Sequence, residues 1–222
     1  MKTLTVLSAA AIIACGAVVF QPIVVMAQAP AAGGAAQQEE LVKISKVNVG
    51  VQKSPKIPAE GPKDKRWTPR DWLEIEVDCE AVLSKKAKDT KQRAYSEVTV
   101  KYYVYLEGQS KEKSRILTGE TVHVNVPIKE EGHSAMYVNP QTIESLTGKK
   151  EGNPTAVKYW GVEILIGGEM VGYKVSPGAP GTPKEPWWSA PTAPAKEAGL
   201  KRKSETPFSV LWSDYHYEER GK

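Results

Sequence analysis

The sequence contains little cysteine, and this scarcity argues against a disulfide-stapled fold. Only Cys15 and Cys79 occur in 222 residues, and Cys15 lies in an apolar leader. Small secreted domains that depend on disulfides carry several pairs of cysteines. We therefore expect hydrophobic packing to stabilise this protein, with Cys79 as a small buried hydrophobic residue. An intermolecular disulfide through Cys79 is the alternative.

Catalytic and cofactor-binding motifs are missing as well. The sequence has no G-x-S-x-G, no H-E-x-x-H and no phosphate-binding glycine loop. Its three histidines, His123, His133 and His216, lie far apart, and none has metal-ligand spacing to another His, Cys or carboxylate. We expect no enzyme, and thus no catalytic residue, no metal site and no cofactor. His216 is interpreted as part of a solvated tail, with a ligand contact as the alternative.

A strong excess of charge of either sign is also lacking. Lysine and arginine number 30 against 26 aspartate and glutamate, a formal net charge of +4. This balance argues against a nucleic-acid partner and against a protein that is held at a membrane surface by its charge. Basic residues do gather in loops, either for solubility or, if the loops meet, to contact an anionic glycan or lipopolysaccharide. The candidate contacts are Lys63, Lys65, Arg66, Lys85, Lys86 and Lys88.

The N-terminus carries the one long hydrophobic run, and its pattern is that of an export signal. Lys2 precedes an apolar stretch that ends in small residues. We expect residues 1–27 to be a signal peptide cleaved after Ala27, and the protein to act in the periplasm, the outer membrane or the cell surface. Two alternatives stay open: a lipid on Cys15 within a lipobox-like segment, or an uncleaved anchor, because about 20 apolar residues span a bilayer.

Two segments of biased composition set the boundaries of the rest of the chain. Residues 28–40 are rich in Ala, Gly and Gln and lack large apolar side chains, which predicts a flexible tether. Residues 177–200 are rich in proline, which removes backbone donors and predicts a semi-extended loop. We expect a single domain over residues 41–222 that includes this loop.

Alternation of apolar and polar residues indicates β-strands between these segments. In residues 72–81 every second side chain is apolar, which places all of them on one face of a strand. Only residues 139–146 look helical, with Asn139 as N-cap and Pro140 at the first helical position. The fold class is therefore all-β: an immunoglobulin-like β-sandwich of about seven or eight strands with one short helix. The expected strands are residues 41–51, 72–81, 96–107, 121–128, 156–166, 169–175 and 207–212.

A stripe of carboxylates, Glu74, Glu76, Asp78 and Glu80, lies on the opposite face of the strand at 72–81. Side chains two residues apart on a strand lie in a row about 7 Å apart. A calcium site or a glycosidase pair needs oxygens that converge on one point. We therefore interpret the stripe as a solvated face, or one that pairs with lysines of a neighbouring strand such as Lys101.

Aromatic residues provide the best functional candidates. Trp187 and Trp188 lie in the proline-rich loop, and adjacent indoles are costly to leave in water because each buries about 150–250 Å² when packed. They either fold back over a sheet of their own domain or bind a partner or a glycan. Tyr103 and Tyr105 add aromatic surface to the face opposite the core valines of their strand. These four residues are the candidate partner-binding set.

Several segments resemble those of one bacterial protein family. The matching features are the leader, the Ala/Gly/Gln tether, RWTPRDWLEIEVDCEA (residues 66–81), YWGVEILIGGEMVGYKV (residues 159–175) and the loop with two tryptophans. They are similar to secreted immunoglobulin-like, outer-membrane-associated proteins encoded with type IV pilus genes in Akkermansia-type Verrucomicrobia. The chain lacks the processing junction and the exposed apolar helix of a type IV pilin. The resemblance therefore implies an accessory or surface protein rather than a pilin subunit.

Together these features predict a non-enzymatic interaction protein of the cell envelope or surface that is pilus-associated or adhesion-related. Its expected partners are envelope or pilus proteins, including further copies of itself. The alternative is a module that binds glycan, either mucin or lipopolysaccharide. The second hypothesis is weaker because sugar-stacking sites usually add planar polar groups near the rings, and the segment around Trp187 and Trp188 offers few.

Overall fold

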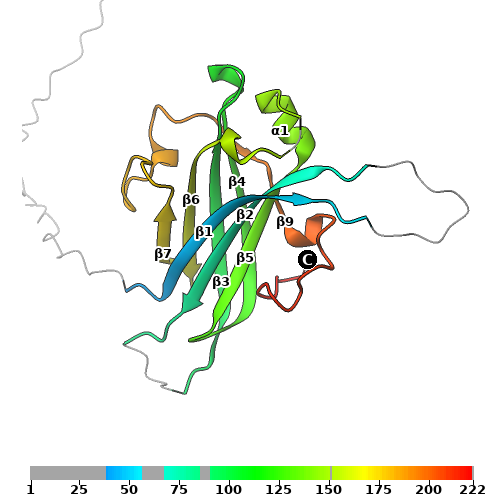
Figure 1. Ribbon diagram of the computed structural model, residues 1–222. Helices are drawn as coiled ribbons and strands as arrows, with labels where there is room; N and C mark the ends of the chain where they lie inside the picture. Colours follow the sequence, from blue (N-terminus) through cyan, green and yellow to red (C-terminus); the bar gives the residue numbers. More distant parts are fainter. Residues whose placement is uncertain (1–38, 57–67, 86–90, 151, 222) are drawn as a thin grey trace, which may run out of the picture. The chain divides into compact units, whose positions relative to one another are not determined.

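The computed structural model describes residues 39–56, 68–85, 91–150 and 152–221 (Figure 1). The expected signal peptide and most of the expected tether lie outside these residues, as do Lys63, Lys65, Arg66, Lys86 and Lys88. The chain divides into a unit of residues 1–36 and a unit of residues 37–222, and the second contains every described residue. No helix within the described ranges is long and apolar enough to cross a membrane.

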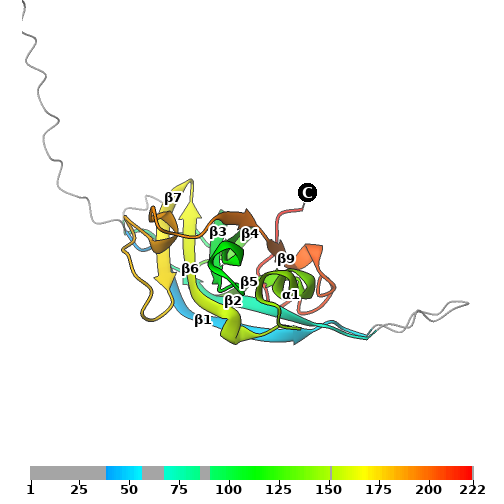
Figure 2. The ribbon, with the colours of Figure 1, turned by 90° about the horizontal axis from the view of Figure 1, so that it is seen from above.

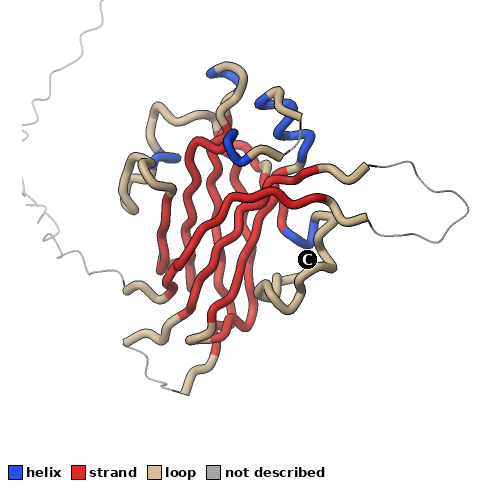
Figure 3. Tube along the Cα trace, in the orientation of Figure 1, coloured by secondary structure: helices blue, strands red, loops and turns tan. Residues whose placement is uncertain are grey.

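The described residues form two β-sheets that pack face to face (Figure 3). The four-stranded sheet has the order β1 (Val42–Lys53), β2 (Asp71–Ala81), β5 (Glu131–Val138) and β9 (Leu200–Arg202). The five-stranded sheet has the order β7 (Glu169–Val175), β6 (Val157–Ile166), β3 (Ala94–Leu106), β4 (Arg115–Pro127) and β8 (Lys196–Ala198). The helix α1 spans Pro140–Thr147, and short 3₁₀ turns span Lys111–Lys113, Pro154–Ala156, Trp187–Ser189 and Lys203–Glu205.

The strand order is that of an immunoglobulin-type sandwich, which confirms the predicted fold class. Strands β1, β2 and β5 form one antiparallel sheet, and β7, β6, β3 and β4 form the other. The chain crosses between the sheets after β2, β4 and β5, as in sandwiches of the immunoglobulin type. The short β8 pairs parallel with β4, and β9 pairs antiparallel with β5.

The core lies between the sheets and is filled by the alternating residues that the sequence indicated. Leu73, Ile75 and Val77 of β2 are fully buried, and they pack in one cluster with the inward residues of β3 and β6. One polar group is enclosed with them. Tyr102 Oη donates to Ser134 Oγ at 2.6 Å, and Ser134 Oγ lies 2.7 Å from Nε2 of the buried His123. This hydrogen-bonding lowers the cost of burying polar atoms in the core.

The short helix is confirmed, and its ends follow from its sequence. The side chain of Asn139 accepts a hydrogen bond from the backbone N–H of Gln141 at 2.8 Å, and Pro140 is the first helical residue. The helix ends at Gly148, whose φ of 69° is a left-handed conformation that glycine adopts without strain.

The prediction of strands was wrong in the last part of the domain and missed β5. Residues 207–212 form turns rather than a strand. The proline-rich segment, expected to be loop throughout, contains the short strand β8. Strand β5 was missed because its residues from Ser134 to Val138 are buried on both faces, so its sequence does not alternate.

The last part of the chain, residues 176–221, packs on the outer faces of both sheets. Residues 176–195, called here the tryptophan loop, pack on the five-stranded sheet. Residues 203–221, called the C-terminal segment, pack on the four-stranded sheet. Figure 2 shows these two segments on different sides of the molecule, one beside β6 and β7 and the other beside β9. The outer face of each sheet is therefore covered in part, whereas polar residues of β1 such as Lys46 and Asn48 stay exposed.

Candidate functional site: an aromatic groove

The two tryptophans fold back over the five-stranded sheet. Trp188 stacks on Tyr103 with ring centroids 4.2 Å apart and planes at 7°, and its centroid lies 5.9 Å from that of Tyr173. The indole of Trp188 lies over Gly161 of β6, where a Cβ atom would overlap Cζ3 of the indole. A glycine at this position therefore allows the ring to approach the backbone of β6 closely.

Trp187 extends this cluster toward the neighbouring tyrosines. Its ring is nearly perpendicular to that of Trp188, with centroids 5.2 Å apart. It lies 6.3 Å from Tyr105 and 5.9 Å from Tyr159, tilted by 31° and 51° to those rings. Each pair of aromatic rings in such an arrangement stabilises the folded state by about 0.5–1.5 kcal/mol beyond the effect of burying its apolar area. The cluster thus anchors a proline-rich segment that has little regular hydrogen bonding.

Of the two alternatives for the tryptophans, the structure supports the one in which they cover their own domain. Trp187 is 5% exposed and Trp188 is 3% exposed. Tyr103 is half-buried beneath Trp188, and its hydroxyl donates to Glu163 Oε2 at 3.0 Å. Burial and Glu163 raise the pKa of Tyr103, so this phenol stays protonated at neutral pH. Among the four candidates, Tyr105 retains partial exposure beside an open groove.

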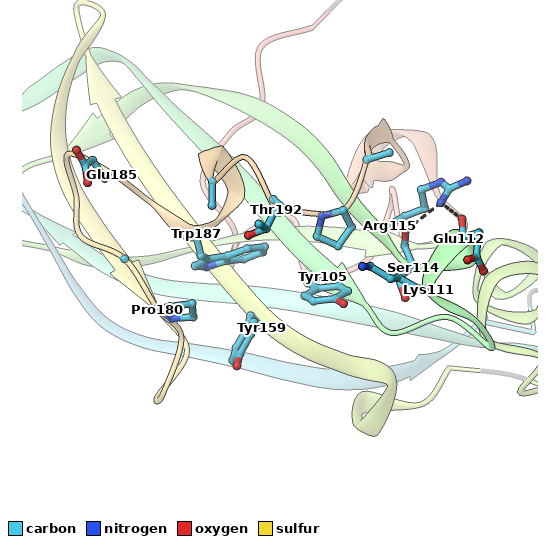
Figure 4. A pocket seen from close by; sticks show the side chains of 15 residues that line it. Tyr105, Lys111, Glu112, Ser114, Arg115, Tyr159, Pro180, Glu185, Trp187 and Thr192 are labelled. Atoms are coloured by element: carbon cyan, nitrogen blue, oxygen red, sulfur yellow. Dashed lines mark hydrogen bonds between the residues drawn. The ribbon is translucent and has the colours of Figure 1, made fainter.

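That groove has a volume of about 470 Å³ and lies between the tryptophan loop and the β3–β4 connection. Figure 4 shows the rings of Trp187, Tyr105 and Tyr159 around it. Small and apolar side chains complete the wall on the loop side: Pro180, Ala190, Thr192, Ala193, Pro194 and Ala195. A concave site with apolar walls and a few polar groups is typical of a binding site.

Charged side chains lie at both ends of the groove. Lys111, Glu112 and Arg115 lie at one end, and Glu185 lies at the other (Figure 4). The guanidinium of Arg115 donates to the backbone oxygens of Ser114 and Glu112, and its Nε lies 3.7 Å from Glu197 Oε2. These bonds restrict the guanidinium to one edge of the site. The groove therefore carries an ordered cationic group and an acidic group at opposite ends.

Sequence reasoning identified Tyr105 and Trp187 but missed the rest of the groove. Tyr159 reaches the site because β6 pairs with β3, where it lies opposite Tyr105 in register. Lys111 and Arg115 reach it through a 3₁₀ turn before β4. No local pattern in the sequence indicated that these residues would line one groove. Of the basic candidates, only Lys85 is described; it is exposed and does not line the groove.

The carboxylate stripe is not a solvated face, which corrects the sequence interpretation. Glu74 is 5% exposed, and Glu76 and Asp78 are partly buried. Lys101 cannot pair with them because it lies on β3, in the other sheet. The neighbours of β2 are β1 and β5, and the C-terminal segment covers its outer face. Burial and the charges of Glu74 and Asp78 raise the pKa of Glu76.

His216 is not part of a solvated tail. Its side chain is 6% exposed and lies against the carboxylate stripe. Burial lowers the pKa of His216 to about 4, so the imidazole is neutral at physiological pH. Within the described part of the chain, one group of side chains has the proximity of metal ligands, namely Glu76, Asp78 and His133.

Comparisons with known proteins support the fold and a bacterial relationship. The model of one protein family matches residues 33–222. A crystal structure of a protein from Akkermansia muciniphila matches with a TM-score of 0.70 and 26% sequence identity, covering 82% of this chain and 93% of that chain. The comparison with curated proteins found no match. The predicted similarity to an Akkermansia protein is thereby supported, while the pilus gene context and secretion stay predictions.

Proposed function

Since this chain belongs to the family whose model matches residues 33–222, we propose that it is a non-enzymatic interaction protein of the cell envelope. Its aromatic groove binds an extended segment of a partner protein. Export to the periplasm, outer membrane or cell surface is part of this proposal, because the leader has the pattern of a signal peptide. Association with pilus or adhesion proteins follows from the family resemblance of the sequence.

The groove itself carries the proposal. It combines half-buried tyrosine rings with alanine and proline walls, and its ends differ in charge. An extended peptide presents apolar side chains to aromatic-lined grooves of this kind, and proline-rich segments bind them with little loss of entropy. Arg115 and Lys111 at one end and Glu185 at the other would fix the direction of a peptide with complementary charges.

Glycan binding is the second candidate, and one observation favours it: aromatic rings line the groove. Two others weigh against it. The rings of Tyr105, Tyr159 and Trp187 are mutually tilted by 31–52°, so they do not form a flat platform for a sugar. The planar polar side chains of the lining, Glu112, Arg115 and Glu185, lie at the ends of the groove rather than beside the central rings. The protein-binding function is therefore preferred.

Photo-crosslinking from the groove tests the proposal. A photoreactive residue replaces the exposed Thr192 at the groove in the native host, and a matched one replaces Ser209, which is exposed on the C-terminal segment. We expect protein adducts from position 192 that are absent from position 209. Adducts with further copies of this chain would identify self-association. Adducts with carbohydrate alone would contradict protein binding and support glycan binding.

Substitutions at Tyr159 show whether such adducts depend on the groove. Tyr159→Ala removes a ring that lines the site, whereas Tyr159→Phe keeps the ring and removes only the hydroxyl. We expect at least a tenfold loss of the protein adduct with alanine and retention with phenylalanine. Equal adduct yields from both variants would contradict binding in the groove. Trp187 and Trp188 are less suitable positions because their burial makes them structural.

A further inference from the structure

A second cluster of functional side chains lies on the outer face of the four-stranded sheet, away from the tryptophan loop. Glu76 and Asp78 project from β2, and His133 projects from the neighbouring β5, where it pairs in register with Asp78. One ligand atom from each of these residues lies within 4.8 Å of the others. Nδ1 of His133 lies 2.8 Å from Oδ1 of Asp78.

His216 reaches the same cluster from the C-terminal segment. A β-bridge places it beside His133, and the backbone N–H of Tyr217 donates to the carbonyl of His133 at 3.0 Å. Its imidazole Nε2 lies 3.6 Å from Oε1 of Glu76. The side chain is 94% buried, and Nε2 has no hydrogen-bond partner among the described residues. A buried polar atom without a partner is uncommon and needs an explanation.

The hydrogen bond on the other ring nitrogen makes this arrangement informative. Nδ1 of His216 lies 3.2 Å from the carbonyl oxygen of Trp212 and must be protonated to donate to it. In the neutral imidazole, Nε2 then carries a lone pair and no proton. A lone pair then faces a carboxylate oxygen 3.6 Å away, an unfavourable contact that a proton or a metal ion between the two atoms relieves. Ligand histidines in metal sites commonly donate their second N–H to a backbone carbonyl in this way.

We propose that Glu76, Asp78, His133 and His216 bind one divalent transition-metal ion of the zinc class. The four side chains supply two carboxylate oxygens and two imidazole nitrogens, a donor set suited to zinc and its first-row neighbours. Calcium fits less well because it takes six to eight oxygen ligands. Binding requires small rotations of the side chains, which their partial exposure permits for Glu76, Asp78 and His133.

The ion would tie the C-terminal segment to two strands that already pair with each other. It would connect β2 and β5 to the C-terminal segment, whose last residues also bond to β4 through Val124 and Arg220. A metal at this point would therefore hold the C-terminal segment on the sheet, a structural role distinct from binding in the aromatic groove. Structural metal sites contribute directly to folding free energy because the unfolded chain lacks the assembled ligands.

Titration calorimetry with ZnCl₂ on the chelator-treated full chain tests the proposal. We expect one ion bound per chain and a rise in the melting temperature with zinc. His133→Ala and His216→Ala should each weaken zinc binding at least tenfold. Glu80→Gln is the control, because Glu80 lies on the same face of β2 as Glu76 and Asp78 but outside the cluster. It should bind zinc as the unaltered chain does.

Absorption spectra of the Co²⁺-loaded unaltered chain keep the test decisive if a histidine variant fails to fold. Imidazole and carboxylate ligands in four-coordinate geometry give intense visible bands, whereas six-coordinate Co²⁺ gives weak ones. Intense bands that zinc removes at one equivalent support the site. Absence of zinc binding by the unaltered chain, or unchanged affinity in the folded His133→Ala/His216→Ala variant, would overturn it.

Discussion

Gly161 is the residue that allows Trp188 to lie on the five-stranded sheet. A methyl group at this position would overlap Cζ3 of the indole and lie 2.7 Å from Cη2. The indole is buried and rigid, so it cannot adjust without leaving its place on Tyr103. We expect Gly161→Ala to lower the free energy of unfolding by about 1–3 kcal/mol, as overpacking typically does. Urea unfolding measures this loss, and red-shifted tryptophan fluorescence in the native state reports the displaced indole.

Gly50 provides the control for this substitution. It lies in β1 without a left-handed φ, and an added Cβ would come no closer than 3.7 Å to another side chain. Gly50→Ala should therefore change the free energy of unfolding by less than about 0.5 kcal/mol. If both glycine variants have the same stability and the same fluorescence, the packing of Trp188 on Gly161 is not as described.

The Cys79 thiol should be unreactive in the folded protein. Burial raises its pKa to about 12, and its side chain is enclosed in the core. At pH 8.5 roughly half of the cysteine side chains in unfolded protein are thiolates. In the folded protein, a pKa of about 12 leaves roughly one molecule in 3,000 as thiolate. Iodoacetamide should therefore modify Cys79 in urea but not in buffer, as read by mass spectrometry of the peptide that contains it. Rapid modification in buffer would contradict the burial.

The same raised pKa has a consequence for stability at alkaline pH. The folded state holds the thiol proton more tightly than the unfolded state, so this contribution to stability is fully present below pH 8.5 or so. It decreases as the pH rises from there toward 12, because only the unfolded chain then releases the proton readily. The free energy of unfolding should fall in that window, and Cys79→Ala should make the fall smaller.

At the scale of elements, the sequence predicted those strands in which apolar and polar residues alternate. Alternation located β2, β3 and β6 because apolar residues recur every second position toward the core. Alternation failed for β5, which is covered on both faces. It also could not show that the C-terminal segment would bury the carboxylates of β2. The groove and the cluster at His133 each combine residues from several elements, so no spacing in the sequence indicates them.

Phe208 is the residue that attaches the C-terminal segment to the four-stranded sheet. It is fully buried, with its ring 4.9 Å from that of Tyr137 and 5.9 Å from that of Trp72. We expect Phe208→Ala to lower the free energy of unfolding by about 3–5 kcal/mol, the usual loss for truncating a buried phenylalanine. Chemical denaturation measures it. Val210 is 70% exposed in the same segment, so Val210→Ala should have almost no effect. Similar losses in both variants would show that the segment is not anchored by this ring.

At the scale of the whole molecule, the two sheets are joined along one side by β1 and β7. Each is an edge strand of its own sheet, and the backbone N–H of Leu41 donates to the carbonyl of Val171 at 3.2 Å. Beside this bond β1 has a register shift between Ile44 and Lys46. Such irregularities, together with lysines, are common on edge strands, where they prevent pairing with another chain.

Lys174 of β7 closes this side of the sandwich. Its ammonium donates to the backbone oxygens of Ile44 and Ser45 at 2.9 and 2.7 Å. These oxygens lie at the irregularity in β1, and they would otherwise be available to a strand of another molecule. Lys174→Met keeps most of the side-chain volume but removes both bonds. We expect a loss of about 1.5–3 kcal/mol in the free energy of unfolding, the usual value for a hydrogen bond to a charged group.

The same change should increase self-association, which light scattering at several protein concentrations measures. Lys158→Met is the control, because that ammonium forms an exposed ion pair with Glu107 and lies 5.5 Å from the ring centroid of Tyr105. Exposed ion pairs contribute about 0–1 kcal/mol. If Lys174→Met is as stable and as monodisperse as Lys158→Met, Lys174 does not protect the edge of β1. If it forms larger species, Lys174 limits the pairing of β1 with a strand of another molecule.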